Sequence, residues 1–251
     1  MEEQNNNFFE VPYDVIPLPS QGVLYPGKKP TVEVEYLTAM DENILTSPNL
    51  LQTGKFIDVL LKRKIRDKEI NQKDLLIGDR NAILIWLRAT GYGEKYPVVI
   101  LDDNGEEFET EIDLTLLNQK PIGATPDENG LFDFDLPMTK KKIKFRLLTV
   151  KDEEELTKRS ESQEKRKAEY SDNLTHKLGM QIMSVDGKTD KEWIFNFARV
   201  MPARDSLALR TYINEIEPCV DLKTTVMGPG GDPIETFLVI GPDFFWPDIR
   251  V

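Results

Sequence analysis

The two side-chain types that nucleophilic and acid–base chemistry use most often each occur once in this sequence. His176 is the only histidine and Cys219 the only cysteine among 251 residues. A Ser–His–Asp or Cys–His site needs a histidine base beside its nucleophile. His176 lies in a highly charged segment that we expect to be exposed. Cys219 begins an expected strand, where a small core residue is the better interpretation. We therefore predict no catalytic residue.

The glycine-rich and acidic turns do not have the patterns of ligand-binding loops. The stretch GPGGD at 228–232 lacks the Lys-Ser/Thr pair and the strand-to-helix context of a phosphate-binding loop. No His/Cys cluster has the spacing of a zinc site. The acidic turns at 102–107 and 127–130 lack the ligand pattern of a calcium loop. We predict a non-enzymatic protein with no cofactor and no metal.

Paired carboxylates occur in two nearly identical stretches, 111 positions apart. These are EYLTAMDENILT at 35–46 and RLLTVKDEEELT at 146–157. Neighbouring carboxylates could perform acid–base work. However, a threonine followed three residues later by an acid is typical of a helix start, where both side chains bond to free backbone N–H groups. Helix capping therefore explains both pairs better than catalysis.

The elements around these stretches repeat in the same order. An alternating run, typical of a half-buried strand, precedes each stretch, at 31–36 and 142–147. An apolar helix that begins at Asp79 or Asp205 follows, and a hairpin comes after each helix. Asn104-Gly105 marks the turn of the first hairpin. We predict an α+β fold of two related modules that arose by internal duplication. Two unrelated capping boxes are the alternative.

The predicted organisation has four parts. They are an extended Pro-rich segment at 1–30, a first α+β module at 31–118, a linker and strand at 119–138, and a second α+β module at 139–251. The second module carries a helical insertion at 158–188, within the charged run 151–177. Further helices are expected at 38–47, 49–64, 80–90 and 189–201. The helix at 80–90 is apolar almost all round, which predicts a central core helix.

Composition limits the compartment and the partners. The apolar fraction is 39% and the charged fraction 30%, as in globular proteins with a wet surface. No apolar run is long enough to cross a membrane, and the first residues do not have the pattern of a secretory signal. A single cysteine fits a reducing cytoplasm. The net charge of −12 makes nucleic acid an improbable partner, because its phosphates would be repelled.

Four stretches together resemble the baseplate hub assembly family of T-even-like contractile-tailed bacteriophages. They are IPLPSQGVLYP at 16–26, YLTAMDENILTSP at 36–48, LLIGDRNAILIWLRATGYGEKYPV at 75–98 and FFWPD at 244–248. The resemblance is strongest over 16–98 and thin from about 119 to 190. It implies a phage tail protein that binds hub or tape measure proteins, either as an assembly chaperone or as a structural hub component. It places the chain in the host cytoplasm during virion assembly, or in the tail baseplate.

Some relatives carry Cys pairs at the hairpin tips, as in a zinc knuckle. This sequence has Asp-Asp-Asn-Gly at 102–105 and only Cys219 at the base of the second hairpin. A tight turn closes a hairpin without metal, so no zinc is expected. A metal-dependent or enzymatic module of unknown substrate is the alternative function.

Apolar residues in the two terminal segments are the candidate protein-binding residues. They are Phe244, Phe245, Trp246 and Pro247 near the C-terminus, and Leu18, Leu24 and Tyr25 in the Pro-rich segment. Aromatic residues buried in a partner's pocket carry much of the energy of an interface. The alternative is that these side chains fold back onto the core of the chain itself. The direct partner, the copy number and the oligomeric state do not follow from the sequence.

Overall fold

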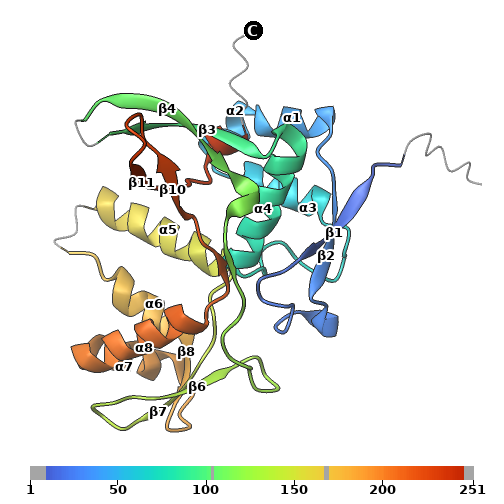
Figure 1. Ribbon diagram of the computed structural model, residues 1–251. Coiled ribbons are helices and arrows are strands. Elements are labelled where there is room, and N and C mark those ends of the chain that lie inside the picture. The colour runs from blue at the N-terminus through green and yellow to red at the C-terminus, as the bar shows by residue number, and fades with distance from the viewer. Residues whose placement is uncertain (1–9, 103–104, 167–169, 246–251) are drawn as a thin grey trace, which may run out of the picture.

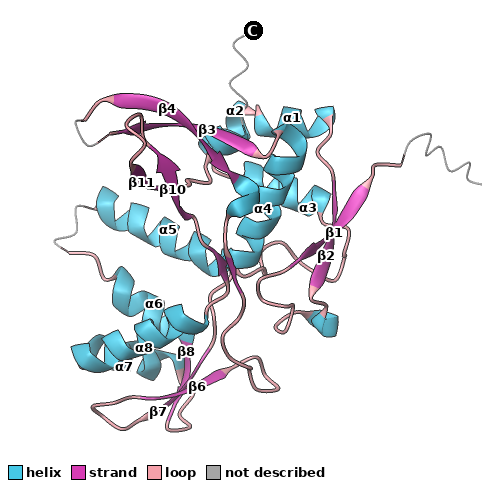
Figure 2. Cartoon of the chain, viewed as in Figure 1, coloured by secondary structure: helices cyan, strands magenta, loops and turns pink. Residues whose placement is uncertain are grey.

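The computed structural model describes residues 10–102, 105–166 and 170–245. Helices alternate with strands that form small, separate sheets around them (Figures 1 and 2). This confirms the predicted α+β class.

The first half contains two hairpins with four helices between them. Its elements are β1 (Tyr13–Pro17), β2 (Thr31–Glu35), α1 (Ala39–Leu45), α2 (Pro48–Gln52), α3 (Phe56–Lys64), α4 (Ile77–Tyr92), β3 (Lys95–Leu101) and β4 (Glu107–Asp113). β1 pairs antiparallel with β2, and β3 pairs antiparallel with β4. A short β5 (Gln119–Lys120) leads into the second half.

The second half begins with a three-stranded sheet and also ends in a hairpin. Its elements are β6 (Phe132–Asp135), β7 (Lys142–Phe145), α5 (Val150–Lys165), α6 (Asn173–Gln181), β8 (Ile182–Val185), α7 (Lys191–Val200), α8 (Ala203–Ile216), β9 (Cys219–Val220), β10 (Lys223–Met227) and β11 (Pro233–Phe237). The sheet order is β6-β7-β8, and all pairs are antiparallel. A 3-10 turn, Pro242–Phe245, ends the described chain.

Helix α4 is the central element of the first half. Ile83, Leu84 and Leu87 on this helix are fully buried. The prediction of a core helix is confirmed, although α4 extends beyond the expected range at both ends.

Three predicted segments differ from the structure. The Pro-rich segment is not wholly irregular, because Tyr13–Pro17 forms β1. The helix expected at 49–64 is two helices, separated where Gly54 adopts a positive φ of 65° that a helix cannot contain. The charged run at 151–177 is α5 followed by the start of α6, and not one helix.

The same local arrangement follows the first strand pair in each half. In the first half, the residue after α3, Ile65, makes an antiparallel bridge to Val34 of β2. In the second half, the residue after α6, Ile182, pairs with Phe145 of β7. Val34 and Phe145 are 111 positions apart, as in the repeated stretches. Within the predicted insertion at 158–188, α6 and the start of β8 thus follow the capped helix in the same order as α3 and Ile65 do in the first half.

Several backbone contacts join the halves. Val150 N donates to Leu75 O at 2.9 Å, and β5 pairs antiparallel with β9. Gly78, at the start of α4, lies so close to the other half that a Cβ there would be 2.1 Å from Pro218 O. Glycine is required at this close approach.

Candidate functional site

The N-terminal candidate residues pack against the start of α4. Leu18 and Tyr25 are buried, and Leu24 is partly buried. Tyr25 Oη donates to Asp79 and accepts from Leu76 N at 2.8 Å, while Ser20 N donates to Asp79 Oδ1 at 2.9 Å. Burial is the main cause that raises the pKa of both Tyr25 and Asp79. Leu18 and Tyr25 therefore serve the chain's own core and present no free surface to a partner.

The C-terminal candidate residues also pack inside. Phe244 and Phe245 are 0% and 1% exposed. Arg88 Nε, from α4, donates to Phe244 O at 2.8 Å, and the Phe244 ring lies 5.2 Å from that of Tyr96. The candidate role of Phe244 and Phe245 as protein-binding residues is thus corrected in favour of the alternative, because both rings fold back onto the first half. Trp246 and Pro247 lie outside the described residues.

The repeated stretches form two matching helix starts. Thr38 N donates to Asp41 Oδ2 at 2.9 Å, and Thr149 N donates to Asp152 Oδ2 at 2.8 Å. Both helices have a complete capping box. Burial opposes ionisation of both aspartates, but their hydrogen bonds and cationic partners outweigh it and lower the pKa of each. Carboxylates held ionised in this way act as caps, as predicted, and are poorly suited to donate protons.

The cation next to the capping aspartate comes from a helix end in the first half and from a strand end in the second half. Lys64 Nζ, at the end of α3, lies 2.6 Å from Asp41 Oδ2. Arg146, just after β7, holds Asp152 through two hydrogen bonds, at 2.6 and 2.8 Å. The position that matches Arg146 in the first half is Glu35. In both halves a cation thus lies next to the capping aspartate, but it comes from the end of the helix in the first half and from the end of the strand in the second.

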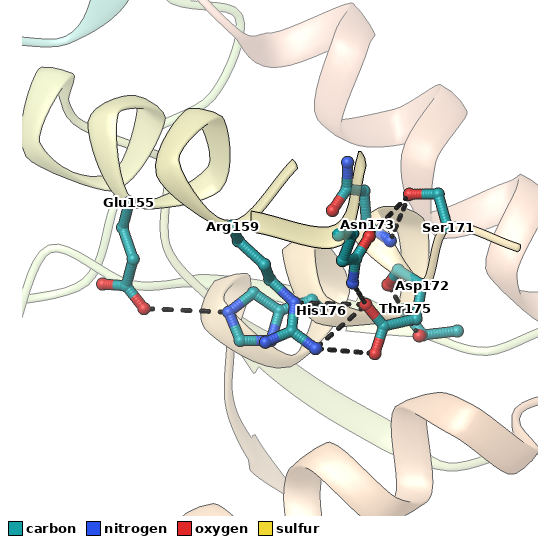
Figure 3. A network of polar contacts seen from close by, with 8 residues as sticks. Glu155, Arg159, Ser171, Asp172, Asn173, Thr175 and His176 are labelled. Atoms are coloured by element: carbon teal, nitrogen blue, oxygen red, sulfur yellow. Dashed lines mark hydrogen bonds and ion pairs between the residues drawn. The ribbon is translucent and has the colours of Figure 1, made fainter. Parts of the chain in front are cut away.

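The only histidine lies between three helices (Figure 3). His176 of α6 has its Nε2 3.7 Å from a Glu155 oxygen of α5, and its ring 5.1 Å from that of Phe195 in α7. The expectation of an exposed histidine is corrected, since its side chain is only 16% exposed.

The neighbours of His176 do not form a nucleophile–base pair. Arg159 binds Asp172 in a bidentate ion pair, with distances of 2.7 and 2.9 Å from Nη2, and Asn173 donates to Ser160 Oγ at 3.0 Å. Figure 3 shows the Arg159–Asp172 pair joining α5 to the start of α6. The network therefore fixes the angle between two helices.

Cys219 is partly buried in β9. Burial is the main cause that raises the pKa of its thiol. A thiol with a raised pKa is a poor nucleophile near neutral pH.

Each half has an open cleft beside the end of its α3 or α6 helix. The first, which we call the α3 groove, has a volume of about 1010 Å³ and is lined by residues 10–11, 35, 61–63, 65–68 and 70–73. The second has a volume of about 490 Å³, and its lining includes Arg146, Gly179, Met180 and Ile182. These occupy the positions that match Glu35, Lys62, Arg63 and Ile65 of the α3 groove.

The α3 groove is basic, which the sequence reasoning missed. Its lining contains five Lys or Arg residues and three acidic residues, Glu10, Glu35 and Asp67, in a chain of net charge −12. The basic run is visible in the sequence, but three consecutive cations at 62–64 are also what the C-terminal end of a helix favours, so the run alone does not indicate a binding groove. Its place in a cavity depends on the packing of residues 10–11 and 35, which are distant in sequence.

Among the described residues, no group of His, Cys, Asp and Glu has a geometry that could hold a metal ion. In the same part of the chain, no helix is both long and apolar enough to span a membrane. No family model, no curated protein and no solved structure matches this chain.

Proposed function

We propose that this chain is a non-enzymatic tail protein that acts in the assembly of the central baseplate hub of a contractile-tailed bacteriophage. It works by binding hub or tape measure proteins in the host cytoplasm during assembly. It holds a partner in an assembly-competent state and covers apolar surface until the next subunit replaces it.

The observation that carries the proposal is the way the resembling stretches meet in space. Stretch 16–26 bonds to stretch 75–98 through Tyr25 and Asp79. Stretch 244–248 bonds to the same helix through Phe244 and Arg88. Stretch 36–48 supplies the capping box of α1. The resemblance thus lies in residues that hold the framework together, and four such stretches in the same order support a shared architecture.

The chemistry of the described residues favours binding. The conspicuous carboxylates are caps or buried acceptors, and the contacts of His176, on α6, in the described part of the chain are with Glu155 and Phe195 and not with Cys219 of β9. The largest cavity described above is an open, charged groove, which suits a protein partner better than an enclosed small substrate.

Quantitative mass spectrometry of purified virions and of lysate from infected cells tests the proposal. A fixed ratio to the tail tube protein in virions would identify a structural hub subunit. Abundance in lysate together with absence from virions would identify an assembly chaperone. The hub proposal is wrong if deletion of the gene leaves baseplate assembly intact. Stoichiometric metal in the purified protein would instead support the metal-dependent alternative.

A further inference from the structure

The α3 groove has cationic side chains without partners. Lys62 and Lys68 line it and are exposed, and neither has a carboxylate within ion-pair distance in the described part of the chain. Arg66 lies over the Tyr13 ring at 3.9 Å, and its nearest carboxylates are 3.7 and 3.8 Å away. Lys62 and Lys68 can therefore accept acidic groups from outside without first breaking an ion pair.

The lining of the groove also includes apolar side chains. Val11, Ile65 and Ile70, which are partly exposed, lie among the cations. The groove therefore matches an extended segment in which acidic side chains share one face with apolar ones. A purely polyanionic ligand would leave the apolar part uncovered.

The outer face of the β3–β4 hairpin has this composition. Val99 and Leu101 are 61% and 59% exposed. They stand opposite Glu109 and Glu107 in the strand register, so all four side chains share one face. Both glutamates are exposed, and neither has an ion-pair partner among the residues that the structure describes.

One copy of the chain cannot join the two surfaces. Figure 1 shows the end of the β3–β4 hairpin on one side of the molecule and α3 with β2 on the other. The two surfaces can therefore meet only between different copies.

We propose that the α3 groove binds the outer face of the β3–β4 hairpin of a second copy of this chain. Lys62 and Lys68 then face Glu107 and Glu109, and Val99 and Leu101 cover the apolar lining. The contact is head-to-tail, so it produces a ring if the rotation closes and a filament if it does not. The net charge of −12 opposes association at long range, but salt at about 0.15 M screens charges beyond roughly 8 Å and leaves the close contact. The inference does not depend on the proposed function.

Sedimentation velocity over a range of micromolar concentrations tests this contact. We expect the mass of the natural chain to rise with concentration. Lys62→Glu with Lys68→Glu, and separately Glu107→Lys with Glu109→Lys, should each weaken association at least about tenfold, because each places like charges face to face. An equimolar mixture of the two variants should associate again. Far-UV circular dichroism checks that each variant is folded.

A matched control places the same charge change elsewhere. Lys165→Glu with Lys191→Glu alters two exposed lysines on α5 and α7 and should leave association unchanged. A single-chain mass at every concentration overturns the proposal, and so does association that survives both reversals or is lost equally in the control. Binding of a labelled oligonucleotide that Lys62→Glu with Lys68→Glu abolishes, in a chain that stays single, would show a nucleic-acid site instead.

Discussion

Lys64 and Asp41 form an ion pair in which each side chain is only 1% exposed. Lys64 Nζ also donates to Tyr36 O at 2.9 Å, and Arg63 Nε lies 3.0 Å from the other Asp41 oxygen. In the second half, the residue that matches Lys64 is the neutral Gln181, which is also 1% exposed. The cations that face the capping aspartate therefore come from the helix end in the first half, as Lys64 and Arg63, and from the end of the strand in the second half, as Arg146.

The different origins of the two cations predict that a cation at position 35 can compensate for the loss of Lys64. Lys64→Gln should lower the free energy of unfolding by about 3–5 kcal/mol, because it removes the buried partner of Asp41. Adding Glu35→Arg should restore part of this loss, since Glu35 occupies the position of Arg146. A double-mutant cycle by urea denaturation measures both effects. Lys62→Gln, at an exposed neighbour, is the control and should cost less than about 0.5 kcal/mol. If the double variant loses as much free energy of unfolding as the two single variants together, position 35 cannot supply the cation as Arg146 does in the second half.

Because Phe244 is fully buried, we expect the turn at Pro242–Phe245 to stabilise the fold. Phe244→Ala should cost about 3–5 kcal/mol, because a fully buried ring is lost and a cavity remains. Phe237→Ala makes the same change at a side chain that is 66% exposed, and should cost less than about 0.5 kcal/mol. Chemical denaturation compares the two variants. Equal costs would mean that Phe244 does not pack on α4.

The hydroxyl of Tyr25 should stabilise the fold through its buried bonds. Tyr25→Phe leaves Leu76 N without its acceptor and Asp79 with one donor fewer, which should cost about 1–3 kcal/mol for each unsatisfied group. Tyr170→Phe removes the hydroxyl of a side chain that is 78% exposed and should change nothing measurable. Thermal unfolding of both variants is the measurement, and a neutral Tyr25→Phe would refute the predicted contribution of these bonds.

The lowered pKa of Asp152 leads us to expect that the chain loses stability in acid. Its folded pKa lies below the ordinary value of 3.8, so the unfolded chain takes up the proton first as the pH falls. The contribution of Asp152 is therefore complete above that ordinary value and is lost as the pH falls through the folded pKa. Asp152→Asn should destabilise the chain at neutral pH, and the difference from the natural chain should shrink in acid. A difference that stays constant across urea curves at decreasing pH would contradict the lowered pKa.

The sequence predicted the helix starts and hairpins whose structure depends on residues close together in the chain. Asp190 accepts from Trp193 N at 2.8 Å and caps α7, which begins close to the start of the helix expected at 189–201. Both capping boxes and both late hairpins also lie where the sequence placed them. The residues that form each cap or turn lie within a few positions of each other, so hydrophobic periodicity and turn residues are sufficient to predict these elements.

Distant packing decided the features that sequence reasoning missed. β1 pairs with β2 across a turn-rich segment, and its pairing is favoured by Tyr25 and Ser20 bonding to Asp79 on a remote helix. The direction in which Phe244 and Phe245 turn depends on Arg88, 156 positions before Phe244. The α3 groove likewise requires residues that meet only in the folded chain.

The packing of the last described turn on α4 has a consequence for synthesis of the chain on the ribosome. Helix α4 is complete at Tyr92, yet Phe244, whose carbonyl accepts from Arg88 and whose ring contacts Tyr96, emerges from the ribosome much later. A nascent chain that has made its first half therefore still exposes an apolar site on it. Translation that stops before residue 244 leaves this site open, and chaperones and proteases act on chains with such unfilled apolar surface.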